Sequence, residues 1–99
     1  MGKRLTRKLR EIWLWCKQHR HEPMETQQER LASRLRGYYN YFGIRCNHQA
    51  VSQFYRGVRA AWRYWLDRRS QRAKMSWERF EELEKVFPLP RPRIVHQWV

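Results

Sequence analysis

Apolar side chains recur every three or four positions in the first half of the chain, which is the spacing of one helix face. One series predicts a helix from Leu5 to His19, with apolar positions Leu5, Leu9, Ile12, Trp13 and Cys16. Pro23 ends this region, because proline disfavours the α conformation in the residue before it. A second series predicts a helix from Glu25 to Phe42, closed by Gly43, with apolar positions Met24, Leu31, Leu35, Tyr38 and Phe42.

Two further helices are predicted in the second half. Asn47 is a suitable N-cap for a helix from His48 to about Ser70, with core positions Val51, Phe54, Tyr55, Val58, Trp62, Trp65 and Leu66. Ser76 is expected to cap a short fourth helix with apolar positions Trp77, Phe80, Leu83 and Phe87. The alternating prolines from Pro88 onward predict an extended arm. No segment shows strand alternation.

The expected fold class is therefore all-α. The chain of 99 residues has room for one modest core. We expect a small three-helix bundle in residues 1–74, followed in residues 75–99 by the short fourth helix and an extended Pro/Arg-rich C-terminal arm. This second part is expected to pack on the helical domain or to trail from it.

The charge of the chain points to a polyanionic partner. Lys and Arg number 22 against 9 Asp and Glu, so the formal net charge is +13. No apolar run approaches the roughly 20 residues that a membrane span needs. The basic residues after Met1 also do not lead into the apolar stretch of a secretory signal. We therefore expect a cytoplasmic protein that binds nucleic acid and no membrane.

The residues required for catalysis are scarce. Asp67 is the only aspartate, which leaves no carboxylate set for two-metal nucleotidyl transfer, and the four glycines are too scattered for a phosphate loop. We expect no enzymatic activity, no catalytic residue and no cofactor. A zinc site would have to combine residues of irregular spacing, Cys16, His19, Cys46 and His48. Both cysteines are interpreted as reduced, and Cys16 as small core filler.

Basic residues interleaved with aromatic rings suit structured RNA, because Lys and Arg neutralise phosphates while rings stack on unpaired bases. Helical phase directs Tyr39, Asn40 and Tyr41 away from the apolar stripe, and for these three RNA contact and structural packing are equally open. The mid-helix Gly37 indicates the close approach of another backbone, protein or RNA. The candidate RNA-binding residues are Arg36, Tyr39, Asn40, Tyr41, Arg56, Arg59, Arg63, Arg68, Arg69, Arg72, Arg91 and Arg93. Three of them, Arg56, Arg59 and Arg63, form a row whose members repel one another unless an anion lies across them.

The segment 31–44, LASRLRGYYNYFGI, resembles the signature of the maturase-specific (X, or thumb) domain of group II intron reverse transcriptases. Segments 62–70 (WRYWLDRRS), 75–80 (MSWERF) and 88–96 (PLPRPRIVH) are similar to the C-terminal end of bacterial members. The resemblance implies a helical thumb that grips structured intron RNA or a template–primer duplex and assists intron splicing. The fingers, the palm and its Tyr-x-Asp-Asp motif have no counterpart, so the resemblance implies a C-terminal fragment without polymerase activity.

Two other functions stay open. Leu14 and Trp15 lie outside the first apolar stripe and indicate a surface that meets an absent partner. In that case the chain is a truncated remnant that only docks on a separate polymerase palm. The basic arm with Arg91 and Arg93 resembles the start of the family's DNA-binding segment, which makes a general DNA-binding protein the third hypothesis.

Overall fold

The fold is known from a computed structural model that describes residues 2–42, 48–69 and 74–92. Within these ranges the chain forms four helices and no strand: α1 (Gly2–Gln18), α2 (Met24–Phe42), α3 (His48–Asp67) and α4 (Trp77–Val86). The prediction of an all-α protein is confirmed. The caps predicted at Gly43 and Asn47 lie outside the described residues.

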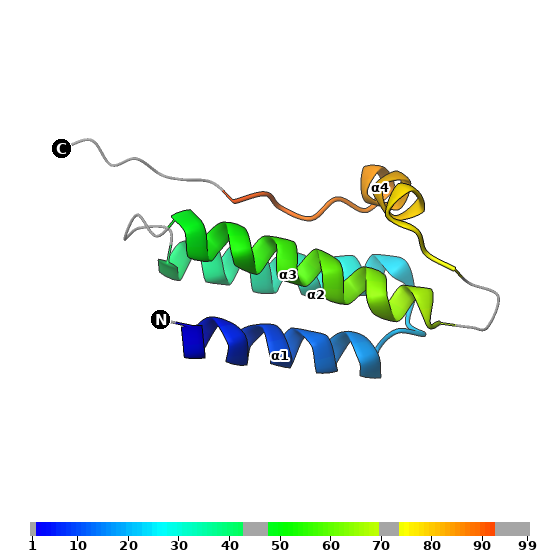
Figure 1. The fold of residues 1–99 in the computed structure, drawn as a ribbon. Helices are drawn as coiled ribbons and strands as arrows, with labels where there is room; N and C mark the ends of the chain where they lie inside the picture. Colours follow the sequence, from blue (N-terminus) through cyan, green and yellow to red (C-terminus); the bar gives the residue numbers. More distant parts are fainter. Residues whose placement is uncertain (1, 43–47, 70–73, 93–99) are drawn as a thin grey trace.

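The first three helices lie side by side (Figure 1), and α1 and α2 both pack against α3. Successive helices run in opposite directions, so α1 and α3 point the same way. Helix α4 lies across one end of α3, and the chain after it returns along the other helices. Two hydrogen bonds tie this returning segment to α2: Gln28 Nε2 donates to the Pro88 carbonyl at 2.7 Å, and the Tyr39 hydroxyl donates to the Pro90 carbonyl at 2.8 Å.

The third helix ends at Asp67, three residues before the predicted end at Ser70. The backbone N–H groups of Arg68 and Arg69 bond to carbonyls three residues back, at 3.2 Å each, which tightens the last turn. The Asp67 carboxylate then accepts the backbone N–H of Met75 at 2.6 Å. The only aspartate of the chain thus holds the connection to α4 against the end of α3.

A single cluster of buried side chains joins all four helices to the returning segment. Its members are Ile12, Cys16, Leu31, Leu35, Tyr38, Val51, Phe54, Val58, Ala61, Trp62, Leu66, Phe80 and Leu89. Helix α4 enters the cluster through Phe80, whose ring meets Trp62 edge-on at 5.6 Å. The predicted cap of α4 is confirmed, because the Ser76 side chain accepts the backbone N–H of Arg79 at 3.2 Å.

Three tryptophans differ from their predicted places. Trp13 and Trp77, predicted as core, are 36% and 43% exposed; such large side chains are rarely covered completely. Trp15, predicted on an outward docking patch, instead packs against the core, with the His19 ring stacked on it at 4.5 Å. Leu14 is 41% exposed, as its position outside the stripe predicted.

Two glycines within helices have opposite surroundings. At Gly57 of α3, an added Cβ would lie only 3.2 Å from Cγ of Leu9, so the missing side chain lets α1 approach α3 closely. At Gly37 of α2, an added Cβ would have no neighbouring atom within 4 Å among the described residues. Of the two approaches expected at Gly37, by protein or by RNA, the protein one is not found among the described residues; a close approach occurs instead at Gly57, by the Leu9 side chain, and Gly37 borders open space.

Candidate nucleic-acid interface

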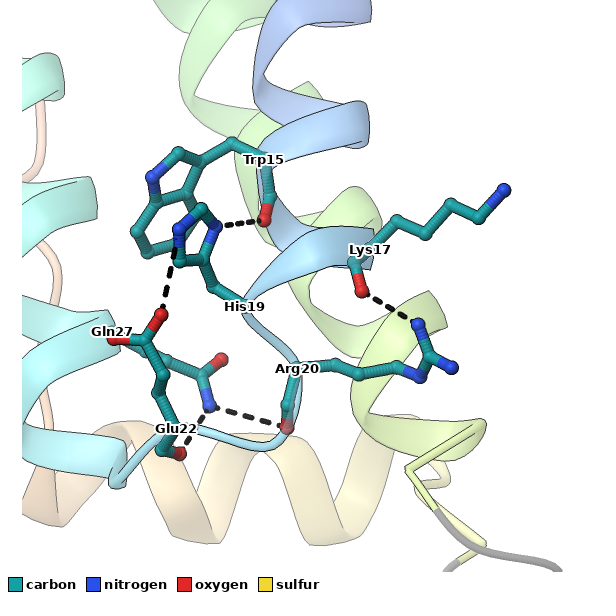
Figure 2. Close-up of polar contacts among 6 residues, drawn as sticks. All are labelled: Trp15, Lys17, His19, Arg20, Glu22 and Gln27. Atoms are coloured by element: carbon teal, nitrogen blue, oxygen red, sulfur yellow. Dashed lines mark hydrogen bonds and ion pairs between the residues drawn. The ribbon is translucent and has the colours of Figure 1, made fainter.

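The turn between α1 and α2 is held by a polar network (Figure 2). The Gln27 side-chain amide donates to the carbonyls of Glu22 at 2.7 Å and Arg20 at 3.4 Å. His19 Nδ1 donates to the Trp15 carbonyl at 2.8 Å, and His19 Nε2 lies 3.4 Å from the Glu22 carboxylate. The Arg20 guanidinium donates to the last-turn carbonyl of Lys17 at 2.6 Å. The turn therefore fixes Arg20 at the C-terminal end of α1, where a cation is favourable.

Three aromatic rings gather where α1 meets α3. The Trp65 ring makes edge-type contacts with Trp13 and Tyr64, with ring centroids 4.8 Å and 5.0 Å apart, and the Trp13 and Tyr64 centroids are 5.8 Å apart. Edge-to-face contacts of this kind hold rings in fixed orientations. Trp13 remains 36% exposed, so part of the aromatic surface faces solvent.

Three cations lie over these rings. Lys17 Nζ is 5.7 Å and the Arg20 guanidinium 5.5 Å from the Trp65 ring, and the Arg68 guanidinium is 3.7 Å from the Tyr64 ring. We name this surface the ring face; it consists of Trp13, Lys17, Arg20, Tyr64, Trp65 and Arg68. Its one ion pair among the described residues joins Arg68 to Asp67 at 3.6 Å. A surface of this composition attracts phosphates and presents rings beside them.

Arg59, in the middle of the predicted α3 row, already has an anionic partner. Its Nε and one terminal nitrogen donate to the two oxygens of Glu84, both at 2.7 Å, in a bidentate pair that is mostly buried. The hydrogen bond to Glu84 raises the pKa of the Arg59 guanidinium, an effect that burial partly opposes. The rings of Tyr55, Trp77 and Phe80 lie within 6 Å of this guanidinium. For Arg59, the anion expected across the row is a side chain of α4.

The other predicted basic residues of α3 and its C-terminal end differ in their surroundings. Arg63 donates to the Met75 carbonyl at 2.8 Å and lies 4.7 Å from the Trp77 ring. Arg69 donates to the Glu22 carbonyl at 3.3 Å. Arg56 is exposed, and Arg68 belongs to the ring face. Arg56 and Arg68 are thus exposed, although Arg68 also contacts Asp67 and Tyr64, whereas Arg59, Arg63 and Arg69 hold protein groups in partly buried contacts.

The candidates on α2 do not form one surface. Arg36, Asn40 and Tyr41 are exposed, Tyr41 to 69%. Tyr39 is half-buried, its hydroxyl is bonded to the Pro90 carbonyl, and burial raises its pKa. RNA contact and structural packing were both open for Tyr39, and the structure shows packing contacts.

The candidates of the C-terminal arm lie mostly beyond the described residues. Arg91 is exposed and borders a hollow between α3, α4 and the returning segment. This hollow also contains the pair of Arg59 and Glu84. Arg72 and Arg93 lie outside the described ranges.

A groove of about 500 Å³ lies between α1 and α2. It is lined by three residues of α1, four of α2 and one of α3: Lys8, Glu11, Ile12, Arg34, Gly37, Tyr38, Tyr41 and Phe54. The groove includes two features that the sequence singled out, Gly37 and Tyr41. Charged side chains from both helices also line it.

Two of the four zinc-ligand candidates can be placed by their side chains. Cys16 is fully buried, as predicted for core filler, and burial raises the pKa of its thiol to about 12. His19 is engaged with Trp15 and Glu22. No group of three or more His, Cys, Asp and Glu side chains suited to a metal occurs in the described part of the chain. Cys46 lies outside that part, and the side chain of His48 is not described.

The ring face was largely missed from the sequence, which singled out only Arg68 among its members as an RNA contact. Trp13, Lys17 and Arg20 follow one another at four- and three-residue spacing along α1 and just past its end, and Arg68, the residue after α3, follows Tyr64 by four. This alternation of ring and cation was available as a signal. That the two series face each other depends on how α1 packs on α3.

Comparison with protein families gave one match: the model of the group II intron, maturase-specific domain matches residues 2–83. Comparisons with curated proteins and with solved structures found no match. Among the described helices, none has the length and apolar character needed to cross a membrane.

Proposed function

Since this chain belongs to the family of the group II intron maturase-specific domain, a domain with a role in splicing rather than catalysis, we propose that it binds structured intron RNA and thereby assists splicing. The template–primer duplex of a reverse transcriptase is the other RNA-containing ligand in this proposal. In this proposal the chain holds the RNA and does not catalyse polymerisation. The observation that carries the proposal is the ring face, where Lys17, Arg20 and Arg68 lie over aromatic rings.

The ring face suits RNA for two physical reasons. Its cations gain from neutralising phosphates, and each phosphate contact releases condensed counterions. Its partly exposed Trp13 presents an apolar plane beside those cations, on which an unpaired base can stack. The net charge of +13 adds long-range attraction for the same ligand.

The predicted residues enter this proposal in three groups. Arg36, Asn40, Tyr41, Arg56, Arg68 and Arg91 are exposed and are proposed to meet RNA directly. Tyr39, Arg59, Arg63 and Arg69 hold protein groups, so an RNA contact requires that they exchange or share those partners. Arg72 and Arg93 are proposed on charge alone.

The test is binding of the full chain to group II intron RNA and to random RNA of the same length, each over a range of salt concentrations. Intron RNA should bind more tightly, and its affinity should fall steeply as salt rises. Lys17→Gln and Arg68→Gln should each reduce the slope of log affinity against log salt by about 1. Lys85→Gln is the matched control, since Lys85 lies on α4 in an exposed pair with Glu82. Affinity that is insensitive to salt and equal for both RNAs would refute the proposal.

Docking on a separate polymerase palm is a second candidate, favoured by the exposed Leu14 and Trp13. Co-purification with a palm half after nuclease treatment tests it, and Leu14→Glu should abolish the association. Binding of DNA through the arm is tested in the same assay as RNA, with duplex DNA as competitor.

A further inference from the structure

The groove between α1 and α2 uses none of the residues of the ring face. Its floor is apolar: Ile12, Tyr38 and Phe54 are at most 8% exposed, and the rings of Tyr38 and Phe54 stack at 3.9 Å. With a volume of about 500 Å³, the groove falls in the size range of small-molecule sites. A planar ligand with apolar faces fits this floor.

Gly37 keeps the α2 side of the groove open. A Cβ at this position would have no neighbouring atom within 4 Å in the described structure, so no protein contact requires the glycine. Glycine within a helix is less favourable than alanine. The missing side chain at Gly37 therefore widens the groove.

Charged side chains stand at both ends of the groove. Because α1 and α2 run in opposite directions, Lys8 lies toward the end where α2 finishes. Arg34 lies toward the other end, where its guanidinium is 5.8 Å from the Trp15 ring. Glu11 is the one acidic residue among those that line the groove. A groove with an apolar floor between two cations is suited to a ligand that has a planar apolar group with an anionic group on each side.

We propose that this groove binds one unpaired nucleotide of an RNA. The base enters over Gly37 and stacks on Tyr41, which is 69% exposed. The phosphates on its two sides meet Lys8 and Arg34, and Glu11 accepts an N–H from the edge of the base. This inference rests on the proposed RNA binding and specifies its ligand, because a fully paired duplex offers no free base.

A test compares two RNA hairpins that differ only in one bulged nucleotide. The bulge carries 2-aminopurine, whose fluorescence falls when the base stacks. The full wild-type chain should bind the bulged hairpin about tenfold more tightly than the paired one, with quenching, since stacking on one aromatic ring supplies a gain of this size. Gly37→Leu fills the groove and should abolish both the preference and the quenching, while affinity for the paired hairpin stays unchanged.

Ala60→Leu is the matched control, because Ala60 is an exposed helix position of α3 outside the groove. It should keep the preference for the bulge. Circular dichroism during heating should show that Gly37→Leu folds at least as stably as the wild type. A second pair of variants tests whether the aromatic ring of Tyr41 is required. Tyr41→Ala removes the ring and should lose the quenching, and Tyr41→Phe keeps the ring and should retain it.

The outcomes distinguish this inference from the proposed function. Equal, salt-dependent binding of both hairpins by the wild type would overturn the nucleotide site and leave RNA binding standing. Failure to bind either hairpin, or intron RNA, would overturn both. If Gly37→Leu keeps the preference for the bulge but loses a protein partner, the groove is a protein-docking site and the inference is wrong.

Discussion

The indole N–H of Trp62 donates to the side-chain oxygen of Gln27 at 3.0 Å, and both side chains are fully buried. The amide nitrogen of the same Gln27 donates to the Glu22 carbonyl. One buried amide therefore connects the largest core residue of α3 to the turn between α1 and α2. This turn also positions Arg20 on the ring face.

Replacing Gln27 with leucine should destabilise the fold while keeping the volume of the side chain. The change leaves the Trp62 N–H without its partner and removes one of the two donors to the Glu22 carbonyl, which keeps its hydrogen bond from Arg69. A buried unsatisfied polar group costs about 1–3 kcal/mol, so the free energy of unfolding should fall by about that amount. Urea unfolding followed by Trp fluorescence measures the change.

Two comparisons identify the hydrogen bond as the cause. Gln53→Leu on the exposed side of α3 should alter stability by no more than about 0.5 kcal/mol. In a Trp62→Phe background, Gln27→Leu should cost less than in the wild type, because the indole donor is already absent. Equal costs in the two backgrounds would show that the bond contributes nothing.

The pair of Arg59 and Glu84 should hold α4 against α3. Glu84→Gln removes the charge from a mostly buried bidentate contact and should lower the free energy of unfolding by about 1.5–3 kcal/mol. Glu82→Gln removes the same charge from the exposed pair with Lys85 and should cost at most about 0.5 kcal/mol. Chemical denaturation of both variants at one salt concentration provides the comparison, and similar values would contradict the structural role of Glu84.

Alkaline pH should destabilise the protein through Cys16. Burial raises the pKa of its thiol from 9.0 to about 12, so the folded state keeps a proton that the unfolded chain releases above about pH 9. The stabilising effect is complete below pH 9 and is lost as the pH rises toward 12, at about 1.4 kcal/mol per unit. Cys16→Ala should be less stable at neutral pH because of the cavity, but its stability should fall less steeply above pH 9.

Unfolding measured at intervals from pH 8 upward, within the range where the wild type still refolds, tests this dependence. Burial also raises the pKa of Tyr38 and Tyr39, and both proteins share that contribution. The difference between the two curves therefore reports Cys16. Parallel curves would show that its thiol titrates normally.

The two helix glycines should respond differently to alanine. Gly37→Ala meets open space and should stabilise the protein by about 0.5–1 kcal/mol, the helix preference of alanine over glycine. Gly57→Ala gains the same preference but pushes its methyl group into Leu9, so its net gain should be smaller or negative. Thermal unfolding of the two variants gives the ranking, and Leu9→Ala should restore the gain at Gly57. A larger gain at Gly57 than at Gly37 would contradict the packing of α1 on α3.

Features that depend on nearby residues were predicted well. Helical spacing placed Ile12, Leu31 and Val58 in the core, and Ser76 at the start of α4, because these properties follow from backbone periodicity and local hydrogen bonds. The end of α3 was placed too late, since a tertiary contact, Asp67 with the Met75 N–H, turns the chain there. The signature around Gly37 and the family match agree on the same segment.

The helices, most of the core and the strongly basic character of the chain could be predicted from the amino-acid sequence, because helical periodicity and charge do not depend on distant neighbours. The contacts of each charged or aromatic side chain depend on the tertiary fold. The sequence predicted Arg59 as a phosphate ligand, but in the fold it pairs with Glu84 of α4. Lys17 was not among the predicted RNA contacts, and the packing of α1 on α3 places it over the Trp65 ring. Pairing between residues far apart in sequence depends on how helices pack, and helix periodicity alone does not specify that arrangement.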